Sequence, residues 1–296
     1  MPTLGFGAAT LGGAYGPTTQ AVADATVRAA LDAGIDFFDT SPWYGNSEEV
    51  LGRALAGVPR ESYTLETKLG RYPDGTFDFS PERVVQSVDE SLRRLKTDHL
   101  DIALCHDIEF VRLGPVIHET LPALRALQVA GKVRYVGVSG LPLAIFPKVL
   151  AETDLDVILS YCHVSLNDDS LQALIPLLNE RGVGVVGASP LAMGLLTDAG
   201  PPAWHPAPPA LKVAARRAAA LCRERGTSLP ALALSYALKQ PGLDTLLVGI
   251  STPEQVAQNA AAEARIDEEL LGNVREIFAP VRSLTWPSGL AENAVA

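Results

Sequence analysis

The sequence has few cysteines: Cys105, Cys162 and Cys222 are the only three in 296 residues. An odd, sparse set of thiols is not the framework of a disulfide-stabilised protein. Their spacing does not match a zinc site, and no carboxylate and histidine cluster has metal-ligand spacing. We therefore expect free thiols, no bound metal ion and a reducing, cytoplasmic setting.

Basic residues and long apolar runs are also scarce. The net charge is −10, because 34 acidic residues outnumber 24 basic ones. An acidic surface argues against nucleic acid or an anionic membrane as a partner. The apolar runs are far shorter than a membrane span of roughly 20 residues. The N-terminal stretch MPTLGFGAATLGG lacks the basic segment that begins a secretory signal, so no such signal is expected.

The rest of the composition, with 47% hydrophobic and 20% charged residues, is ordinary for a globular protein with a large core. Short apolar runs alternate with longer amphipathic ones. The runs that read as strands are Thr3–Gly7, Ile35–Phe38, Tyr63–Thr67, Leu100–Cys105, Val133–Val138, Val157–Ser160, Val183–Ala188 and Thr245–Gly249. Eight strand-helix units in about 260 residues predict an α/β fold, a single-domain (β/α)8 TIM barrel over residues 1–296, rather than an open doubly wound sheet.

Helices are predicted between these strands, and two irregular segments interrupt the alternation. The helix-like runs include Thr19–Ala33, Ser47–Ala56, Pro81–Lys96, Pro115–Ala130, Asp169–Arg181, Leu211–Arg225 and Leu229–Lys239. The proline-rich segment Ala199–Ala210 reads as a long loop after the seventh strand, on the catalytic face. The tail from about residue 282 has no periodicity and is predicted to be coil.

Reactive side chains follow three successive strands. Asp39 ends the second strand in GIDFFDTSPWYG, Lys68 follows the third and His106 the fourth. In a (β/α)8 barrel such positions meet at the C-terminal mouth. A buried Asp39 needs a partner, and an ammonium at ~4 Å attracts it by about 4 kcal/mol at an effective dielectric of ~20. We therefore predict an Asp39–Lys68 ion pair.

Tyr44 lies in the loop after Asp39, close to the predicted ammonium. A nearby cation favours the phenolate, so we expect a lowered Tyr44 pKa and a role as general acid or base. His106 would hold a substrate oxygen beside it. Each residue alone has a structural alternative: Asp39 as a turn cap, Lys68 as a solvated lysine and His106 as a packed histidine. Their joint occurrence at successive strand ends favours catalysis.

Several segments together resemble the aldo-keto reductase family over nearly the whole chain. They are GIDFFDTSPWYGNSEEVLGRAL, TKLG, CHD, GVSG and SPLAMGLLT. The resemblance implies a catalytic tetrad of Asp39, Tyr44, Lys68 and His106 and a nicotinamide cofactor. Family members usually open with a hairpin that plugs the barrel bottom, and we expect this chain to lack it because the sequence begins almost at strand one.

A narrower likeness, carried by CHDIEF, GLPLAIF, DVILSYCH, GPPAWHPA and LTWPSG, is to family members that oxidise L-galactose at C1 to the lactone. It implies a sugar dehydrogenase with Tyr44 as base, and oxidation of L-fucose or D-arabinose is the nearest alternative. Other readings stay open: an NADPH-dependent aldehyde reductase, a Schiff-base aldolase on Lys68, or a non-catalytic barrel that holds cofactor. The partner is a small sugar, and the chain is a monomer or small homo-oligomer.

The resemblance also implies a set of cofactor contacts. They are Ser139, Ser160, Ser189, Leu191, Gly194, Gly249, Ser251, Thr252, Gln255 and Asn259. Helix-start amides near Thr252 are a ready anion site. Members that prefer NADP usually carry basic residues where this chain has Ser251 and Gln255, so a 2′-phosphate would lack a partner. We predict NAD, with NADP possible if Arg216 or Arg265 reaches the site.

The sugar contacts are the least constrained part of the sequence. Trp43, beside the tetrad, can stack on a sugar face or simply pack in its loop. Asp107, with Glu109 nearby, can accept sugar hydroxyls or be solvated, and His163 is similar. Trp204 in the proline-rich loop can act with His205 and Trp286 as a lid or only pin the loops. We take Trp43, Asp107, His163 and Trp204 as candidate substrate contacts.

Overall fold

The computed structural model describes residues 3–13, 15–262 and 266–294, and eight parallel strands in it close a barrel in the order β1 to β8. The strands are β1 (Thr3–Gly7), β2 (Phe37–Asp39), β3 (Thr64–Leu69), β4 (Leu100–Cys105), β5 (Val133–Gly140), β6 (Val157–Tyr161), β7 (Gly184–Ala188) and β8 (Thr245–Gly249). The predicted (β/α)8 barrel is confirmed, and β1, β4 and β8 have the predicted bounds. β1 begins at Thr3, the first described residue.

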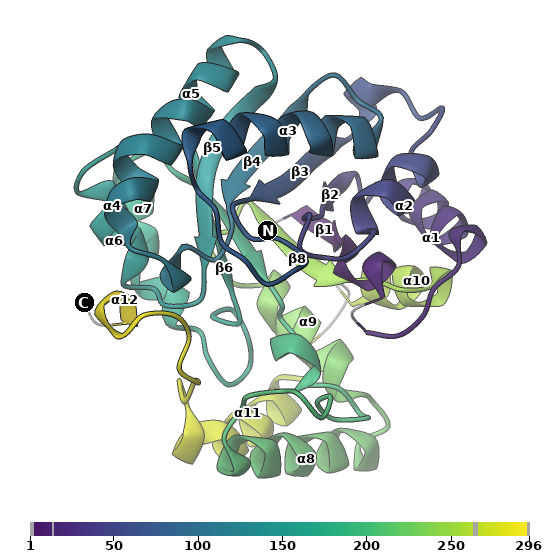
Figure 1. Cartoon of the computed structure of the whole chain (residues 1–296). Helices are drawn as coiled ribbons and strands as arrows, with labels where there is room; N and C mark the ends of the chain where they lie inside the picture. The colour runs from purple at the N-terminus through teal and green to yellow at the C-terminus, as the bar shows by residue number, and fades with distance from the viewer. Residues whose placement is uncertain (1–2, 14, 263–265, 295–296) are drawn as a thin grey trace.

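Helices surround this barrel (Figure 1). They are α1 (Gln20–Asp32), α2 (Ser47–Ala54), α3 (Pro81–Leu95), α4 (Leu113–Pro115), α5 (Leu121–Val129), α6 (Ile145–Leu150), α7 (Ile175–Glu180), α8 (Pro209–Glu224), α9 (Leu229–Leu238), α10 (Pro253–Ala261), α11 (Glu268–Phe278) and α12 (Ala291–Ala294). Within the described residues, no helix is both long and apolar enough to cross a membrane.

The differences from the predicted helices have local causes. The predicted helix Pro115–Ala130 is α4, a π-helical turn over Val116–Thr120 and then α5, because Pro122 cannot donate the backbone hydrogen bond of its turn. The loop prediction for 199–210 holds except that α8 already begins at Pro209. The tail is not entirely coil: the short helix α12 was not predicted, and Asn293 in it donates to the backbone oxygens of Glu109 and Val111.

Alternation along the strands separates two layers of core. A cluster built from strand residues alone fills the barrel interior, and it contains Phe37, Ile102, Leu104, Val157, Leu159, Val186, Ala188 and Leu247. Residues of the opposite parity, such as Phe38 and Leu65, pack outward in the cluster shared with the helices. Because side chains alternate, Asp39 and Lys68 point inward with the first set, near the end of their strands.

Candidate active site

An ion pair inside the barrel joins the ends of β2 and β3. Lys68 Nζ donates to Asp39 Oδ1 and also to the backbone oxygen of Thr40 at 3.0 Å. The Lys68 side chain is 2% exposed and that of Asp39 is 8% exposed. The predicted pairing is confirmed, and it keeps the ammonium charged. Burial lowers the pKa of Lys68, but Asp39 and other neighbours raise it by more, so the net shift is upward.

Tyr44 is held over this pair by the turn that follows β2. Its backbone N–H donates to Ser41 O at 3.0 Å, and its carbonyl accepts from Ser47 N at 3.2 Å. Gly12 packs directly against the turn, because a Cβ there would lie 1.6 Å from Tyr44 O. The Tyr44 ring centroid lies 5.0 Å from Lys68 Nζ. The turn therefore fixes the phenol beside the ammonium.

The predicted lowering of the Tyr44 pKa is wrong for this structure. Burial raises the pKa of Tyr44 more than Lys68 lowers it, and the carboxylates of Asp39 and Asp107 raise it further. The Lys68 effect has the predicted sign but is outweighed by desolvation. The phenol is consequently protonated at neutral pH before any ligand adds its own charge.

His106 completes the group at the end of β4. Its ring packs edge-on against Tyr44, with 5.6 Å between centroids and 87° between planes. Its Nδ1 lies 2.9 Å from Ser41 Oγ, which accepts from Trp43 N at 3.1 Å and is therefore free to donate its own hydrogen to the ring. Burial, Lys68 and Arg71 hold the His106 pKa well below its usual range. This pairing favours a neutral imidazole with its hydrogen on Nε2.

A second ion pair lies next to His106, on the side predicted for the sugar. Arg71 pairs with Asp107, and its guanidinium carbon lies 4.1 Å from the Trp43 ring centroid. His106 Nε2 is 3.6 Å from Asp107 Oδ2. Trp43 and Asp107 are thus brought together beside the tetrad. The sequence reading missed Arg71, although it follows Lys68 by three residues in TKLGR.

Glu109, considered as a second acceptor for sugar hydroxyls, is instead covered by the tail. It is fully buried, and its Oε1 accepts from Leu141 N at 3.2 Å and Ser288 Oγ at 3.0 Å. Burial and the neighbouring Asp107 raise its pKa to about 7. Its backbone oxygen also accepts from Leu290 N at 2.8 Å. Glu109 anchors the C-terminal segment beside the mouth.

The other two candidate sugar contacts lie in different surroundings. His163 is buried, with Nδ1 3.3 Å from Ser160 Oγ and Nε2 3.9 Å from Asp168 Oδ2. Trp204 is 56% exposed and stacks on His205, with ring centroids 6.0 Å apart. His205 in turn meets the buried Trp286 edge-on at 5.0 Å. These aromatic contacts pin the proline-rich loop to the tail.

The residues predicted for the cofactor fall into two groups. Around the barrel end, Ser139 Oγ accepts from Asp107 N at 3.1 Å, and Ser160 pairs with His163, so both hydroxyls already have protein partners. Ser189, Leu191 and Gly194 lie in the tight turn after β7, where Ser189 and Gly194 have φ of 56° and 94°. Ser139 and Ser160, which were predicted to bind the nicotinamide carboxamide side of the cofactor, therefore hydrogen-bond within the protein in this structure.

The second group lies at the start of α10, after β8 ends at the exposed Gly249. Thr252 caps the helix by accepting from Gln255 N at 3.3 Å, and Gln255 Oε1 accepts from Ser251 N at 2.7 Å. Asn259 lies one turn further along α10. A helix start beside a bare glycine backbone suits a phosphate group, so these residues fit the anionic end of a dinucleotide. Arg216 lies on α8, and Arg265 is outside the described residues.

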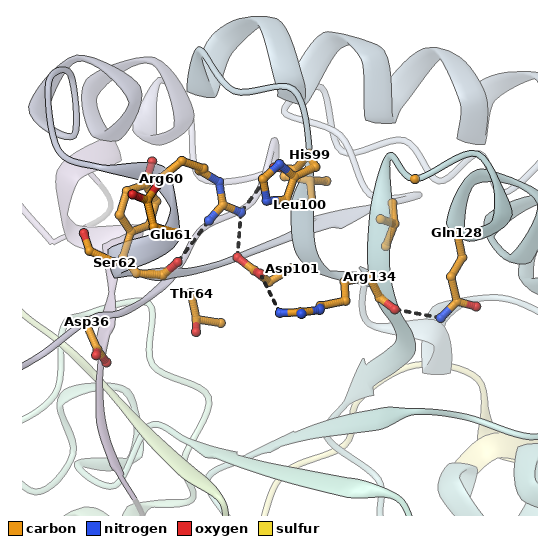
Figure 2. A pocket seen from close by; sticks show the side chains of 13 residues that line it. Asp36, Arg60, Glu61, Ser62, Thr64, His99, Leu100, Asp101, Gln128 and Arg134 are labelled. Atoms are coloured by element: carbon orange, nitrogen blue, oxygen red, sulfur yellow. Dashed lines mark hydrogen bonds and ion pairs between the residues drawn. The ribbon is translucent and has the colours of Figure 1, made fainter.

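A cavity of about 850 Å³ opens at the opposite end of the barrel (Figure 2). It is lined where β2 to β5 begin, and Arg60 and Arg134 point at Asp101 across it, at 2.6 and 3.9 Å. Asp101 also accepts from Leu65 N at 2.9 Å. Asp101 therefore ties the start of β4 to β3 through Leu65 and to the two arginines, which is a structural role at the N-terminal end of the barrel.

Among the described residues, no group of three or more histidine, cysteine, aspartate or glutamate side chains could hold a metal ion. The three cysteines are buried free thiols.

Comparison with known proteins agrees with this geometry. The sequence profile of the Aldo/keto reductase family matches residues 3–278. The chain is 50% identical to the L-galactose dehydrogenase of Arabidopsis thaliana, with 99% of this chain and 95% of that protein covered. It is 36% identical to the D-arabinose 1-dehydrogenase of Saccharomyces cerevisiae, over 78% of this chain and 73% of that protein. Among solved structures, an aldo-keto reductase of Bacillus halodurans in its holo form superposes with a TM-score of 0.76 at 27% identity, covering 99% of this chain and 95% of that one.

Proposed function

Because the chain belongs to the aldo/keto reductase family, we propose that this oxidoreductase is an NAD-dependent sugar dehydrogenase that oxidises an L-galactose-like aldose at C1 to the lactone. The observation that carries the proposal is the buried Asp39–Lys68 pair with Tyr44 and His106 packed on it. The 50% identity over the whole chain to an L-galactose dehydrogenase supports the choice of sugar.

In this proposal, each member of the tetrad has one task. Tyr44 takes the proton of the C1 hydroxyl, and the Lys68 ammonium stabilises the phenolate from which it acts. Asp39 keeps Lys68 charged and in place. Neutral His106, with its hydrogen on Nε2, donates to the sugar oxygen without adding charge. A bound nicotinamide supplies the carbon that accepts the hydride.

The sugar itself would lie against the Trp43 and Asp107 side of the mouth. Trp43 offers an aromatic face, and Arg71 behind it holds the Asp107 carboxylate. Carboxylates of this kind accept hydrogen bonds from ring hydroxyls, which fixes the orientation of C1 toward Tyr44. Trp204, on the exposed proline-rich loop, is proposed as an outer contact, and His163 as part of the buried support under the pocket.

The direct test is a matrix of initial rates. L-galactose, L-fucose and D-arabinose are each offered with NAD and with NADP, and the reduced nicotinamide is followed by absorbance. We expect the highest kcat/KM for L-galactose with NAD, and D-galactose is the stereochemical control. Preference for another of these sugars would change the substrate, whereas no turnover of any sugar would refute the proposal.

Aldehyde reduction is the second candidate, because the protonated Tyr44 suits a general acid at neutral pH. The same residues serve both directions, so kcat/KM for reduction of methylglyoxal with NADH or NADPH is compared with that for sugar oxidation. A Schiff-base aldolase is disfavoured, because the charged Lys68 is a poor nucleophile. Borohydride trapping of a carbonyl substrate on Lys68 would favour the aldolase instead.

The preference for NAD over NADP has its own test. Gln255→Arg places a cation at the start of α10 and also frees Ser251 N from the Gln255 side chain. A charge-assisted bond to a 2′-phosphate is worth about 1.5–3 kcal/mol, so kcat/KM with NADP should rise by roughly 10- to 100-fold. Gln258→Arg, exposed on the same helix, adds the same charge further from its start and is the matched control. Equal gains in both variants, or a wild-type preference for NADP, would contradict the assignment.

A further inference from the structure

Glu66 is a fully buried acid directly below the tetrad. It precedes Lys68 by two residues on β3, so the two side chains share the inward face of the strand. Its strand-pair partner on β2 is Asp39. Both of its carboxyl oxygens lack a hydrogen-bond donor among the described residues. Burying a charged carboxylate without a hydrogen-bond donor costs a large amount of free energy, so the protonation state of Glu66 has to be considered.

The groups that face Glu66 bring one positive charge and one negative charge. Asp39 comes from β2 and Lys68 from β3, whereas the neighbour in register on β4 is the apolar Ile102. On β1, Gly7 stands opposite Asp39 and contributes no side chain. If both carboxyls were ionised, this buried cluster would carry an uncompensated negative charge. A single proton shared by the two carboxyls makes the cluster neutral.

We propose that Glu66 is a positioning residue: a neutral carboxylic acid that donates its O–H to the Asp39 carboxylate and so holds Asp39 on Lys68. The inference rests on the proposed roles of Lys68 and Tyr44 in catalysis. It explains why no donor reaches the protonated oxygen of Glu66, because that oxygen is itself the donor and Asp39 is its partner. The other oxygen of a neutral acid carries no charge, so it costs less to bury without a donor than a carboxylate oxygen does.

The electrostatic direction agrees with this assignment. Burial, and after it the Asp39 carboxylate, raises the pKa of Glu66 well above its usual range. A hydrogen bond from Glu66 spreads the charge of Asp39 over more atoms. Tyr44 then feels more of the Lys68 ammonium and less of the carboxylate, which favours its phenolate. Glu66 thus acts on the proton of Tyr44 through Asp39 and Lys68.

The protonation state is measured first, in the intact protein without substrate. Glutamate is labelled with ¹³C at the carboxyl carbon, and the spectrum is recorded at pH 9, above the Glu109 pKa of about 7. We expect one carboxylic-acid signal that is absent in Glu66→Gln. Glu48 is an internal control, because it is equally buried but accepts from Thr67 Oγ1 and Arg94 Nε and should give a carboxylate signal. The absence of any carboxylic-acid signal at pH 9 would overturn the proposal, whatever the enzyme's substrate.

The positioning role is measured from the pH profile of kcat. The kcat for oxidation should rise with pH as Tyr44 loses its proton. Glu66→Gln keeps a neutral donor toward Asp39, so the midpoint of this rise should stay at its wild-type value. Glu66→Leu has no donor, and its midpoint should move up by about half to one pH unit, which is roughly three- to tenfold in rate below the midpoint. A downward shift in Glu66→Gln would mean that Glu66 was charged, and an unshifted Glu66→Leu would mean that it only fills space. Either result rejects the positioning role, and both can be read with any substrate that the enzyme oxidises. With an aldehyde that it reduces, Tyr44 acts as the acid, and the same shifts are read from the fall of kcat with pH.

Discussion

Replacement of Tyr44 by phenylalanine is expected to lower kcat for sugar oxidation by about 10²- to 10⁴-fold, the usual contribution of a general acid or base. The hydroxyl is the only group removed, and the ring can keep its contacts with Lys68 and His106. The turn is held by backbone hydrogen bonds to Ser41 and Ser47, so the fold of the mouth does not depend on the phenol. Cofactor affinity, measured by quenching of protein fluorescence, should stay within about twofold of wild type.

Tyr161→Phe is the matched control for this variant. Tyr161 ends β6, and burial also raises the pKa of its phenol well above the usual range. Its hydroxyl lies 3.3 Å from Glu109 Oε1 rather than beside Lys68. We expect a less than tenfold effect on kcat. If Tyr161→Phe removed turnover and Tyr44→Phe retained most of it, the proton-transferring group would be Tyr161 and the tetrad assignment would fail.

The placement of the tetrad followed from strand ends and alternation, both of which are written in the sequence. β2 and β3 end where apolar runs meet Asp39 and Lys68, and parallel strands of a barrel bring such ends together. The ion pair followed from the cost of a lone buried charge. These are local rules applied to neighbouring strands, so no long-range information was needed to predict them.

The pKa of Tyr44 required information that the sequence does not carry. The effect of Lys68 was predicted with the correct sign, but the net direction depends on how much water the closed turn removes from the phenol. That burial depends on side chains that the fold brings together, such as the His106 ring at the end of β4, which is far from Tyr44 along the chain. A pairwise charge argument therefore gave a lowered pKa where the folded site raises it.

For Glu66 the sequence did carry the relevant information, because its inward position can be predicted from its place in the third strand. In YTLETK the acid stands at i−2 from Lys68, so alternation alone places it on the inward face. The register that sets it opposite Asp39 is a tertiary property. The pairing of Gln255 with Ser251, by contrast, depends on side-chain rotamers at the start of α10 that sequence spacing does not specify.

In Lys68→Met, the rate of sugar oxidation should rise at a higher pH than in wild type, and the rate at neutral pH should be lower. Tyr44 must lose its proton to act as base, so oxidation should increase with pH toward its raised pKa. With 5.0 Å between Nζ and the Tyr44 ring centroid, a unit charge at an effective dielectric of ~20 stabilises the phenolate by about 3 kcal/mol. Its loss corresponds to about two pH units, or roughly 100-fold at a fixed pH below the midpoint. The pH dependence of kcat at saturating sugar and NAD measures the shift.

Asp39→Asn tests the same electrostatics with the opposite sign. It removes a carboxylate that raises the pKa of Tyr44 while leaving the ammonium, which still donates to Thr40 O at 3.0 Å. The midpoint of the alkaline rise should therefore move down, whereas Lys68→Met moves it up. A purely structural effect of these two substitutions would lower the rate in both without separating the midpoints. Midpoints that coincide with wild type in both variants would show that neither charge controls the titrating proton, and the base would then be a group other than Tyr44.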